Sequence, residues 1–309
     1  MDVVIVGSCI TDFSSYVSHL PQKGETLTGH KFETGFGGKG GNQCIAAVKL
    51  GAKTAMVAKL GDDVFGKSYF ENLKDNNVNC DHVQRVTGEA TGIASIFVGD
   101  DGSNCIVIVP NANDLLTTDD VEKAEDLIKS AKLVVCQNEV PRETTLYALK
   151  LAQKHGVVTI FNPAPAPPKD IDPEFFTVPD IFCPNETEAS TLLGMNVNSP
   201  ESAQEACGQF INSKGCKSVI ITLGEKGAVY QASKDDAPIH IPTVPVAAVD
   251  TTGAGDSFIG SLAFFLTNRP TLTVPEMIQR AGQIAAVSVT KTGTQKSFPK
   301  AEEVPDLVK

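Results

Sequence analysis

The stretch "KLVVCQNEVPRETTLYALKLAQKHGVVTIF", residues 132–161, contains the pattern that decides the fold. Its two ends, residues 132–136 and 157–161, are continuous apolar runs rich in valine. Strands buried on both faces of a parallel sheet have this pattern, whereas half-exposed strands alternate. The residues between them, 142–156, carry apolar side chains at helical spacing. A strand, a helix and a second strand in this order indicate an α/β protein.

The same alternation continues along the chain. Apolar runs also occur at residues 3–7, 54–60 and 218–223, and helix-like segments occur at 42–51 and 119–131. The sequence therefore predicts a doubly wound, mostly parallel sheet with helices on both faces.

Two regions interrupt this alternation. Residues 13–36 and 89–110 are β-prone, and the second contains the hairpin turn signal "GDDGSN". We expect them to form a small β-sheet lid, with residues 1–12, 37–88 and 111–309 as the α/β core. The alternative is that they extend an edge of the main sheet.

Composition narrows the class of partner. The chain has 309 residues, 41% hydrophobic content and a formal net charge of −11. Nucleic acids and membrane surfaces usually require a basic face, so we expect neither as a partner. Eight scattered cysteines without a C-x-x-C pair indicate reduced thiols. We therefore expect a cytoplasmic protein, with entry into the nucleus by diffusion or retention left open.

Three glycine-bearing stretches are candidate phosphate sites. The first, "GDDVFGKS" at residues 61–68, fits the P-loop pattern. However, Asp62 and Asp63 would bring carboxylates toward the phosphates, and the bulky Val64 and Phe65 resist the backbone angles of an anion nest. We expect instead a turn into a helix, with Asp62 or Asp63 as the cap, Phe65 packed inward and Lys67 in solvent.

The second stretch, "GFGGKG" at residues 35–40, fits G-x-G-x-x-G, but the polar residues before it are not a buried strand. A glycine loop followed by a helix, with Lys39 and then Asn42, suits the close approach of a polyol.

The third stretch, "VDTTGAGDSFIGSLAFFL" at residues 249–266, places small residues at the start of an apolar helix. Free N–H groups at a helix N-terminus bind anions. Asp256 lies beside that point, either as a general base or as a simple helix cap. An anion hole next to a base suits phosphoryl transfer to an alcohol.

Four motifs in order carry a family resemblance: "GGKGGNQ" (37–43), "CPNETEA" (183–189), "ITLGEKG" (221–227) and "DTTGAGDSF" (250–258). With them the chain resembles the ribokinase, or phosphofructokinase-B type, family of sugar kinases from Val3 to about Pro299. The resemblance implies ATP-dependent phosphorylation of D-ribose at its 5-hydroxyl to ribose 5-phosphate. It also implies Mg²⁺, an activating K⁺, and a homodimer joined through the β-sheet lid.

The resemblance assigns roles to individual residues. Asp256 would be the general base, and the amides of Gly253, Ala254 and Gly255 would form the anion hole. The positions that match sugar binding are Ile10, Thr11, Asp12, Gly38, Lys39, Gly40, Gly41, Asn42, Glu139 and Asp256. The positions that match nucleotide and Mg²⁺ binding are Asn185, Glu188, Thr222, Leu223, Gly224, Glu225, Lys226, Gly227, Gly255, Asp256 and Gly282. The positions that match the monovalent-cation loops are Asp250, Thr252, Ser288, Lys291, Gly293 and Ser297.

Two departures from the family pattern bear on specificity. Bacterial ribokinases carry Asn where this chain has Ile10, so one sugar hydrogen bond is missing. Relatives often place Asn or His near the adenine, where this chain has Gly282. Kinases of the same family for fructose, adenosine or pseudouridine therefore stay open as alternatives, as does an inactive sugar-binding protein on the same fold.

Overall fold

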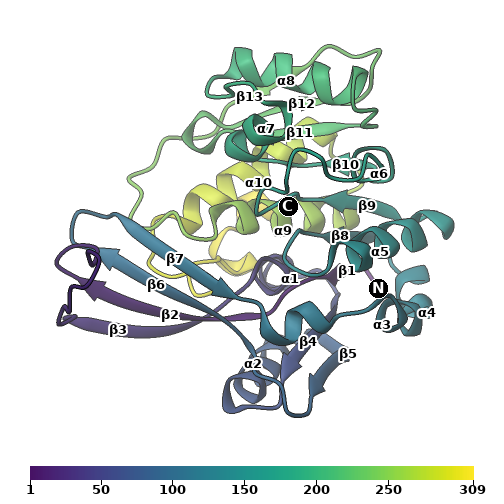
Figure 1. Cartoon of the computed structure of the whole chain (residues 1–309). Helices are drawn as coiled ribbons and strands as arrows, with labels where there is room; N and C mark the ends of the chain where they lie inside the picture. The colour runs from purple at the N-terminus through teal and green to yellow at the C-terminus, as the bar shows by residue number, and fades with distance from the viewer.

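A computed structural model describes the whole chain, residues 1–309. Its main feature is a nine-stranded sheet in the order β13-β12-β11-β10-β9-β8-β1-β4-β5 (Figure 1). The strands are β1 (Val3–Val6), β4 (Thr54–Gly61), β5 (Asn79–Val86), β8 (Leu133–Cys136), β9 (Val158–Phe161), β10 (Ile181–Phe182), β11 (Val219–Thr222), β12 (Ala228–Gln231) and β13 (Ile239–Ile241). All pairings are parallel except those of β12 and β13 at one edge.

The helices form a layer on each face of this sheet. Val3 and Ile5 of β1 face one layer, whereas Val4 and Val6 face the other. The first layer contains α1 (Lys39–Lys49), α2 (Val64–Asp75), α9 (Ala254–Asn268), α10 (Val274–Ser288) and α11 (Pro305–Val308). The second contains α3 (Thr118–Lys123), α4 (Glu125–Lys129), α5 (Arg142–Lys154), α6 (Glu174–Thr177), α7 (Glu186–Leu193) and α8 (Pro200–Asn212). The predicted doubly wound α/β fold is confirmed, and no helix is long and apolar enough to cross a membrane.

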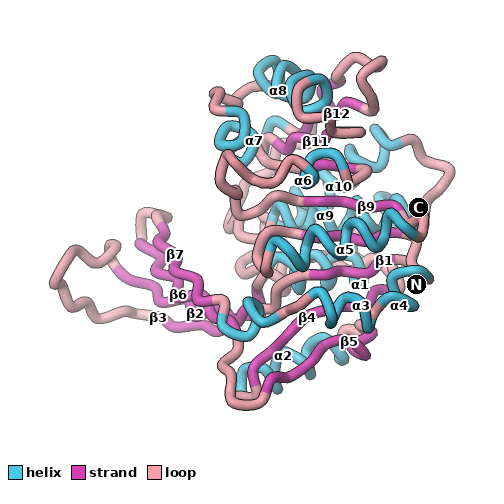
Figure 2. The backbone as a smooth tube through the Cα atoms, turned by 45° about the vertical axis from the view of Figure 1, so that its right-hand side comes forward, coloured by secondary structure: helices cyan, strands magenta, loops and turns pink.

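A separate four-stranded sheet projects from the core as an arm (Figures 1 and 2). It consists of β2 (Ile10–Val17), β3 (Lys31–Gly37), β6 (Gly92–Gly99) and β7 (Asn104–Val109), in the order β3-β2-β6-β7. The prediction of a small sheet beside the main one is confirmed, and the alternative of an edge extension is wrong. The sheet starts at Ile10, three residues before the boundary we expected, because Ile10 already pairs with Gly37.

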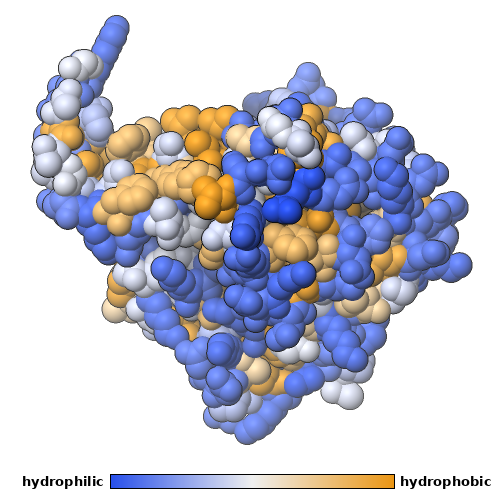
Figure 3. Space-filling model, turned by 90° about the horizontal axis from the view of Figure 1, so that it is seen from below, coloured by the Kyte–Doolittle hydropathy of each residue, from blue (hydrophilic) through white to orange (hydrophobic).

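The edge strand of this arm has exposed apolar side chains. Ile106, Val107, Ile108 and Val109 of β7 are all more than 40% exposed, as is Phe32 of β3. Figure 3 shows apolar side chains gathered on and beside the arm, whereas much of the rest of that view is hydrophilic. Exposed apolar side chains gathered in this way can mark a site of interaction with another molecule.

Residues 61–68, the P-loop look-alike "GDDVFGKS", form a turn that leads into helix α2. Asp63 is the N-cap of α2 and accepts the N–H of Gly66 at 2.8 Å, and it also accepts the Thr91 hydroxyl at 2.6 Å. Lys67 is exposed, as expected. Phe65 does not pack into the core: it stays 37% exposed and contacts Phe13 of the arm, with ring centroids 5.0 Å apart. That expectation was wrong because the arm provides an apolar neighbour outside the core.

Candidate active site

The site lies where the strand order reverses. From β1 the chain proceeds to β4 on one side and later returns to β8 on the other. Open α/β sheets bind ligands at such a point, outside the carboxyl ends of the strands. Ser8 follows β1 and Glu139 follows β8, and the Ser8 hydroxyl donates to Glu139 Oε2 at 2.6 Å. The N–H of Lys39, at the start of α1, donates to the same oxygen at 2.8 Å.

The glycines before and inside α1 allow close backbone approach. A Cβ on Gly37 would lie 2.2 Å from Oδ2 of Asp12, and a Cβ on Gly40 would lie 2.6 Å from the Ser8 nitrogen. Gly38 has a φ of 81°, in the left-handed region. The N–H of Gly41 donates to the Ser8 carbonyl at 2.9 Å, so this amide is not available to a ligand. The loop thus brings Asp12, Lys39 and the Ser8–Glu139 pair to one rim.

Charges on this rim shift one another's pKa values. Burial, together with the negative charges of Glu139 and Asp256, raises the pKa of Asp12 to about 7. Burial also raises the pKa of Glu139, and the positive charge of Lys39 offsets part of this rise. Burial lowers the pKa of Lys39, but the carboxylates of Asp256, Glu139 and Glu188 outweigh it and leave that pKa raised. Lys39 is therefore a firmly charged ammonium group among carboxylates.

Asp256 lies in the first turn of α9, which begins after Gly253 with its φ of 79°. Its carboxylate does not cap the helix. Oδ2 accepts the side-chain N–H of Asn42 at 2.9 Å, and Oδ1 accepts that of Gln43 at 3.0 Å. The alternative of a simple cap is therefore wrong, because two amides of another helix, α1, hold this carboxylate.

Free amides surround the start of α9. The N–H groups of Gly253, Gly255 and Asp256 have no acceptor within the chain. The N–H of Ala254 donates to the Thr251 carbonyl at 3.2 Å, which corrects the expectation that all three amides of 253–255 are free. A Cβ on Gly255 would meet nothing within 4 Å, so the side-chain position of this residue faces open space. Such unpaired N–H groups are suited to bind an anion.

A pocket of about 650 Å³ opens beside this helix start. Seven of the positions assigned to the nucleotide line it: Thr222, Gly224, Glu225, Lys226, Gly227, Gly255 and Gly282. The other lining residues include apolar side chains that were not assigned to the site: Ile241, Val244, Val246, Phe258, Ile278, Ala286 and Val289. An apolar pocket with a few polar groups is typical of a cofactor or nucleotide site.

Some positions assigned to the nucleotide lie elsewhere. Leu223 is buried and does not line the pocket, and its N–H donates to the Gly227 carbonyl at 2.8 Å.

Gly282 does line the pocket, and a polar group lies beside it. A Cβ on Gly282 would lie 3.4 Å from the Thr243 hydroxyl oxygen, which is buried without a partner. Thr243 therefore offers a polar group beside the position where relatives have Asn or His.

Asn185 and Glu188 form a capping box at the start of α7. Asn185 accepts the N–H of Glu188 at 2.8 Å, while Glu188 accepts the main-chain N–H of Asn185 at 2.8 Å and its side-chain N–H at 3.0 Å. Burial raises the pKa of Glu188 to about 7. No three His, Cys, Asp or Glu side chains converge to hold a metal.

The Asp250 carboxylate joins the two loops assigned to a monovalent cation. Oδ1 accepts the N–H of Thr252 and Oδ2 accepts that of Gly293, both at 2.9 Å. The carbonyl oxygens of Asp250, Thr252, Lys291 and Gly293 accept no hydrogen bond from the chain. Carbonyl oxygens without donors are the groups that replace the water shell of K⁺ in proteins. The donor set therefore fits such an ion.

The side chains in these loops point to other partners. Ser288 donates to the Ala285 carbonyl at 2.7 Å, and Ser297 donates to the Thr294 carbonyl at 2.8 Å. The Lys291 ammonium pairs with Glu303 at 2.7 Å. Only main-chain groups of Lys291 can therefore face a cation.

Two positions assigned to the sugar lie at the start of the arm. Ile10 is 2% exposed and has no polar side-chain atom. The Thr11 hydroxyl is buried without a partner. Residues that the sequence analysis did not assign to the site are Ser8, Tyr69, Asn162, Gln137, Gln43 and Gln295. Gln43 lies inside the quoted motif "GGKGGNQ". Gln295 lies in the second loop assigned to the monovalent cation, residues 288–297. Both are therefore close in sequence to positions that the analysis did assign.

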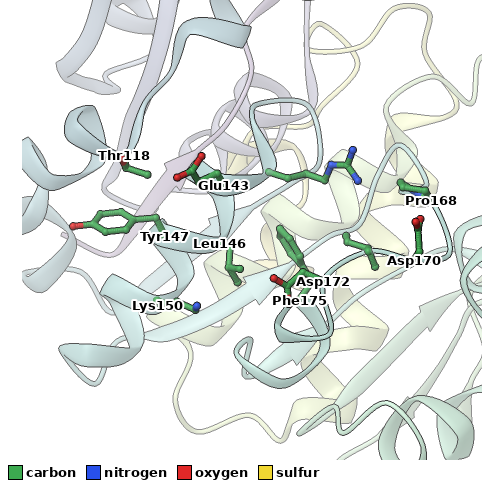
Figure 4. A pocket seen from close by; sticks show the side chains of 11 residues that line it. Thr118, Glu143, Leu146, Tyr147, Lys150, Pro168, Asp170, Asp172 and Phe175 are labelled. Carbon is green, nitrogen blue, oxygen red and sulfur yellow. The ribbon is translucent and has the colours of Figure 1, made fainter.

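A second pocket, of about 580 Å³, lies between α5 and the segment 168–175 (Figure 4). Figure 4 shows Leu146, Tyr147 and Lys150 on one side, with Pro168 and Asp170 on the other. Lys150 pairs with Glu174 at 2.6 Å. This pocket contains none of the assigned positions and shares no residue with the pocket at α9.

Comparisons with known proteins show which family the chain resembles. The family model described as pfkB family carbohydrate kinase matches residues 1–301. The chain is 50% identical to a ribokinase of Mus musculus over 98% of this chain and 93% of that one. It is 39% identical to a deoxyribokinase of Salmonella typhi over 98% and 97% of the two chains. The ribokinase structure of Arabidopsis thaliana complexed with ribose and ATP superposes with a TM-score of 0.89 at 33% identity, and covers 100% of this chain and 98% of that one.

Proposed function

This chain belongs to the pfkB family of carbohydrate kinases, and we propose that it transfers the γ-phosphoryl group of ATP to the 5-hydroxyl of D-ribose. The observation that carries the proposal is the start of α9. Asp256 is held there by Asn42 and Gln43, beside the unpaired amides of Gly253 and Gly255. A base next to an anion hole is the arrangement that phosphoryl transfer to an alcohol requires.

In this proposal Asp256 takes the proton of the sugar hydroxyl as that oxygen attacks the γ-phosphorus. The N–H groups of Gly253, Gly255 and Asp256 stabilise the charge that develops on the phosphoryl oxygens. One such donor is typically worth about 3–4 kcal/mol, and a general base about 10²–10⁴-fold in rate.

The rim at the switch point suits a sugar. Asp12, Lys39 and Glu139 offer acceptors and a charged donor for hydroxyl groups. Asn42 has one side-chain N–H that the chain does not use, because Asp256 takes only the other. We propose that these four residues bind the ribose. The presence of the base and of its partners argues against an inactive sugar-binding protein.

A second candidate substrate is 2-deoxyribose. Ile10 offers no hydrogen bond where bacterial ribokinases carry Asn, and one relative is a deoxyribokinase. A site with one polar group fewer discriminates less against a sugar that lacks a hydroxyl.

A coupled ADP-release assay across ribose, 2-deoxyribose, fructose, adenosine and pseudouridine tests the proposal. We expect ribose to give the highest kcat/KM. A higher kcat/KM with 2-deoxyribose would favour the second candidate, and turnover confined to fructose or a nucleoside would overturn both.

We also propose Mg²⁺ as the metal of the reaction. Magnesium in phosphoryl-transfer enzymes is usually bound by one or two carboxylates together with substrate phosphates. Each oxygen of Glu188 accepts one hydrogen bond from Asn185 and keeps a further lone pair, so Glu188 would be the carboxylate that holds the ion together with the nucleotide phosphates.

We propose that K⁺ activates the enzyme through the Asp250 loops. The four carbonyl oxygens without donors support this assignment. Activity in KCl should exceed that in NaCl at equal ionic strength, and Asp250→Ala should remove the difference. Equal rates of the unmodified enzyme in both salts would contradict the assignment.

We propose a homodimer through the arm. The supporting observation is the exposed apolar edge strand β7. Adjacent residues of a strand face opposite sides of the sheet, so Ile106→Lys and Val107→Lys test the two faces separately. Sedimentation velocity should show a dimer that one of these variants converts to a monomer. A monomeric unmodified protein would exclude the interface.

A further inference from the structure

The carboxylate of Asp256 belongs to a buried chain of side-chain hydrogen bonds. One branch starts at Oδ1. Gln43 Nε2 donates both to this oxygen, at 3.0 Å, and to Asn162 Oδ1, at 3.1 Å. Gln43 Oε1 accepts the amide of Gln137 at 2.7 Å. Because both amide hydrogens of Gln43 and its oxygen have partners, the amide can hold only one orientation.

The other branch starts at Oδ2 and runs through Asn42. Gln295 Nε2 donates to Asn42 Oδ1 at 3.1 Å, which leaves the Asn42 amide nitrogen to face Asp256. Gln295 Nε2 also donates to the Tyr69 hydroxyl at 3.1 Å, and its Oε1 accepts the Asn72 amide at 3.0 Å. Without Gln295, the Asn42 amide could rotate and present its oxygen to the carboxylate.

Neither glutamine is placed to touch a ligand. Gln43 is 0% exposed and Gln295 is 7% exposed. Gln43 uses its whole amide on Asp256, Asn162 and Gln137. The two N–H groups of Gln295 are taken by Asn42 and Tyr69. Their effect on chemistry must therefore pass through Asp256 and Asn42.

We propose that Gln43 and Gln295 are positioning residues for Asp256, Gln43 directly and Gln295 through Asn42. The inference rests on the proposed function, since it assigns both to the same base. Hydrogen bonds donated to a carboxylate favour its ionised form and fix its orientation. The two glutamines thus hold the carboxylate of the base in a fixed orientation toward the sugar hydroxyl.

The test compares pH profiles of three methionine variants. Gln43→Met removes one N–H donor of Asp256, so its acid limb in kcat should move up by about one pH unit. At neutral pH kcat should fall about tenfold or more, because the base is also misoriented. The KM for ribose should change less than about twofold, since Gln43 does not reach the sugar. Gln295→Met should move the limb the same way by a smaller amount.

Gln231→Met is the matched control. Gln231 is 4% exposed and donates to two main-chain carbonyls, of Ser233 and Asp236, at 3.1 and 2.9 Å. This variant loses two donated hydrogen bonds, as Gln43→Met does, at a buried place in β12 that has no hydrogen bond to Asp256 or Asn42, so it should lose stability but keep the pH profile. A shifted profile in Gln231→Met would show that general loosening moves the limb, and would overturn the inference.

A double-mutant cycle between Gln43 and Asp256 is a second test of the proposal. In an Asp256→Asn background the base is absent, so Gln43→Met should change the residual rate less than about threefold. An equal loss in both backgrounds would overturn the inference, as would an unchanged profile in a folded Gln43→Met enzyme. If Gln43→Met does not fold, Gln295→Met alone decides. An unmodified enzyme inactive on every sugar would instead refute the proposed function.

Discussion

Gly260 of α9 and Ala46 of α1 are in contact so close that a Cβ on Gly260 would lie 2.5 Å from the Ala46 Cβ. The same Cβ would lie 2.5 Å from the Gln43 carbonyl oxygen. The missing side chain lets the two helices approach at one turn from Asp256. This approach is what allows Asn42 and Gln43 of α1 to reach the carboxylate on α9.

Gly260→Ala should push α9 away from α1. We expect a loss of about 1–3 kcal/mol in the free energy of unfolding, as for other overpacked sites. The kcat of the folded enzyme should also fall, because the hydrogen bonds from Asn42 and Gln43 to Asp256 lengthen. Denaturant unfolding and kcat measure the two effects.

Gly208→Ala provides the control. Gly208 lies inside α8, and a Cβ there would meet only Asn212, at 3.9 Å. Alanine at an unobstructed helical position should stabilise the protein by about 0.5–1 kcal/mol without affecting kcat. A Gly260→Ala enzyme with normal kcat would show that the helix contact does not position the base.

The sequence could predict the layers of this fold because its central strands are continuous apolar runs. It could not predict β5, β10, β12 and β13, which are amphipathic or short, or the break between α3 and α4 at Ala124. Alternating strands such as "NCDHVQRV", residues 79–86, resemble loops when their neighbours are unknown. Local pattern contains no information on pairing partners.

The site shows the same limit. The motifs around Lys39 and Asp256 could be recognised separately, and both lie at the site. Their direct contact through Asn42 and Gln43 spans more than 210 residues and depends on Gly260. The engaged amide of Ala254 also could not be foreseen, because it depends on the turn formed by Thr251.

Asp256→Asn should abolish phosphoryl transfer. The amide preserves shape but cannot accept the proton, so we expect kcat to drop by about 10²–10⁴-fold. Nucleotide affinity should stay nearly unchanged, because the pocket beside α9 is intact. Isothermal titration with ADP and single-turnover kinetics measure the two quantities. Substantial turnover in the variant would remove Asp256 from the role of base.

The two glycines at the start of α9 should respond differently to alanine. Gly255 faces open space, so Gly255→Ala should fold normally but place a methyl group in the anion hole and lower kcat. Gly253 has a φ of 79°, and its Cβ would lie 2.5 Å from Thr294. Gly253→Ala should therefore lose about 1–3 kcal/mol of stability. Thermal melts paired with kcat separate the cases, and a fully active Gly255→Ala enzyme would contradict the anion hole.

The raised pKa of Asp12 predicts a stability cost at high pH. Its pKa is about 7 in the folded protein against 3.8 as the ordinary value, so between these values the folded state binds more protons than the unfolded state. The contribution of Asp12 to the free energy of unfolding is therefore fully present below about pH 4, and it is lost as the pH rises to about 7. Asp12→Asn should stabilise the protein at pH 8 by on the order of 2 kcal/mol, and by less at pH 5. Urea unfolding at both pH values measures this, and an equal change at both would contradict it.

The P-loop look-alike should prove to be structural. Lys67→Ala should leave the KM for ATP nearly unchanged, because Lys67 is exposed on α2 and does not line the pocket at α9. Asp63→Ala should cost about 1–2 kcal/mol of stability, because it removes the cap of α2. It also removes the bonds that tie α2 to Thr91, at 2.6 and 2.8 Å. ATP titrations and unfolding curves distinguish the variants. A large rise in the KM for ATP with Lys67→Ala would place the phosphates at residues 61–68 and not at α9.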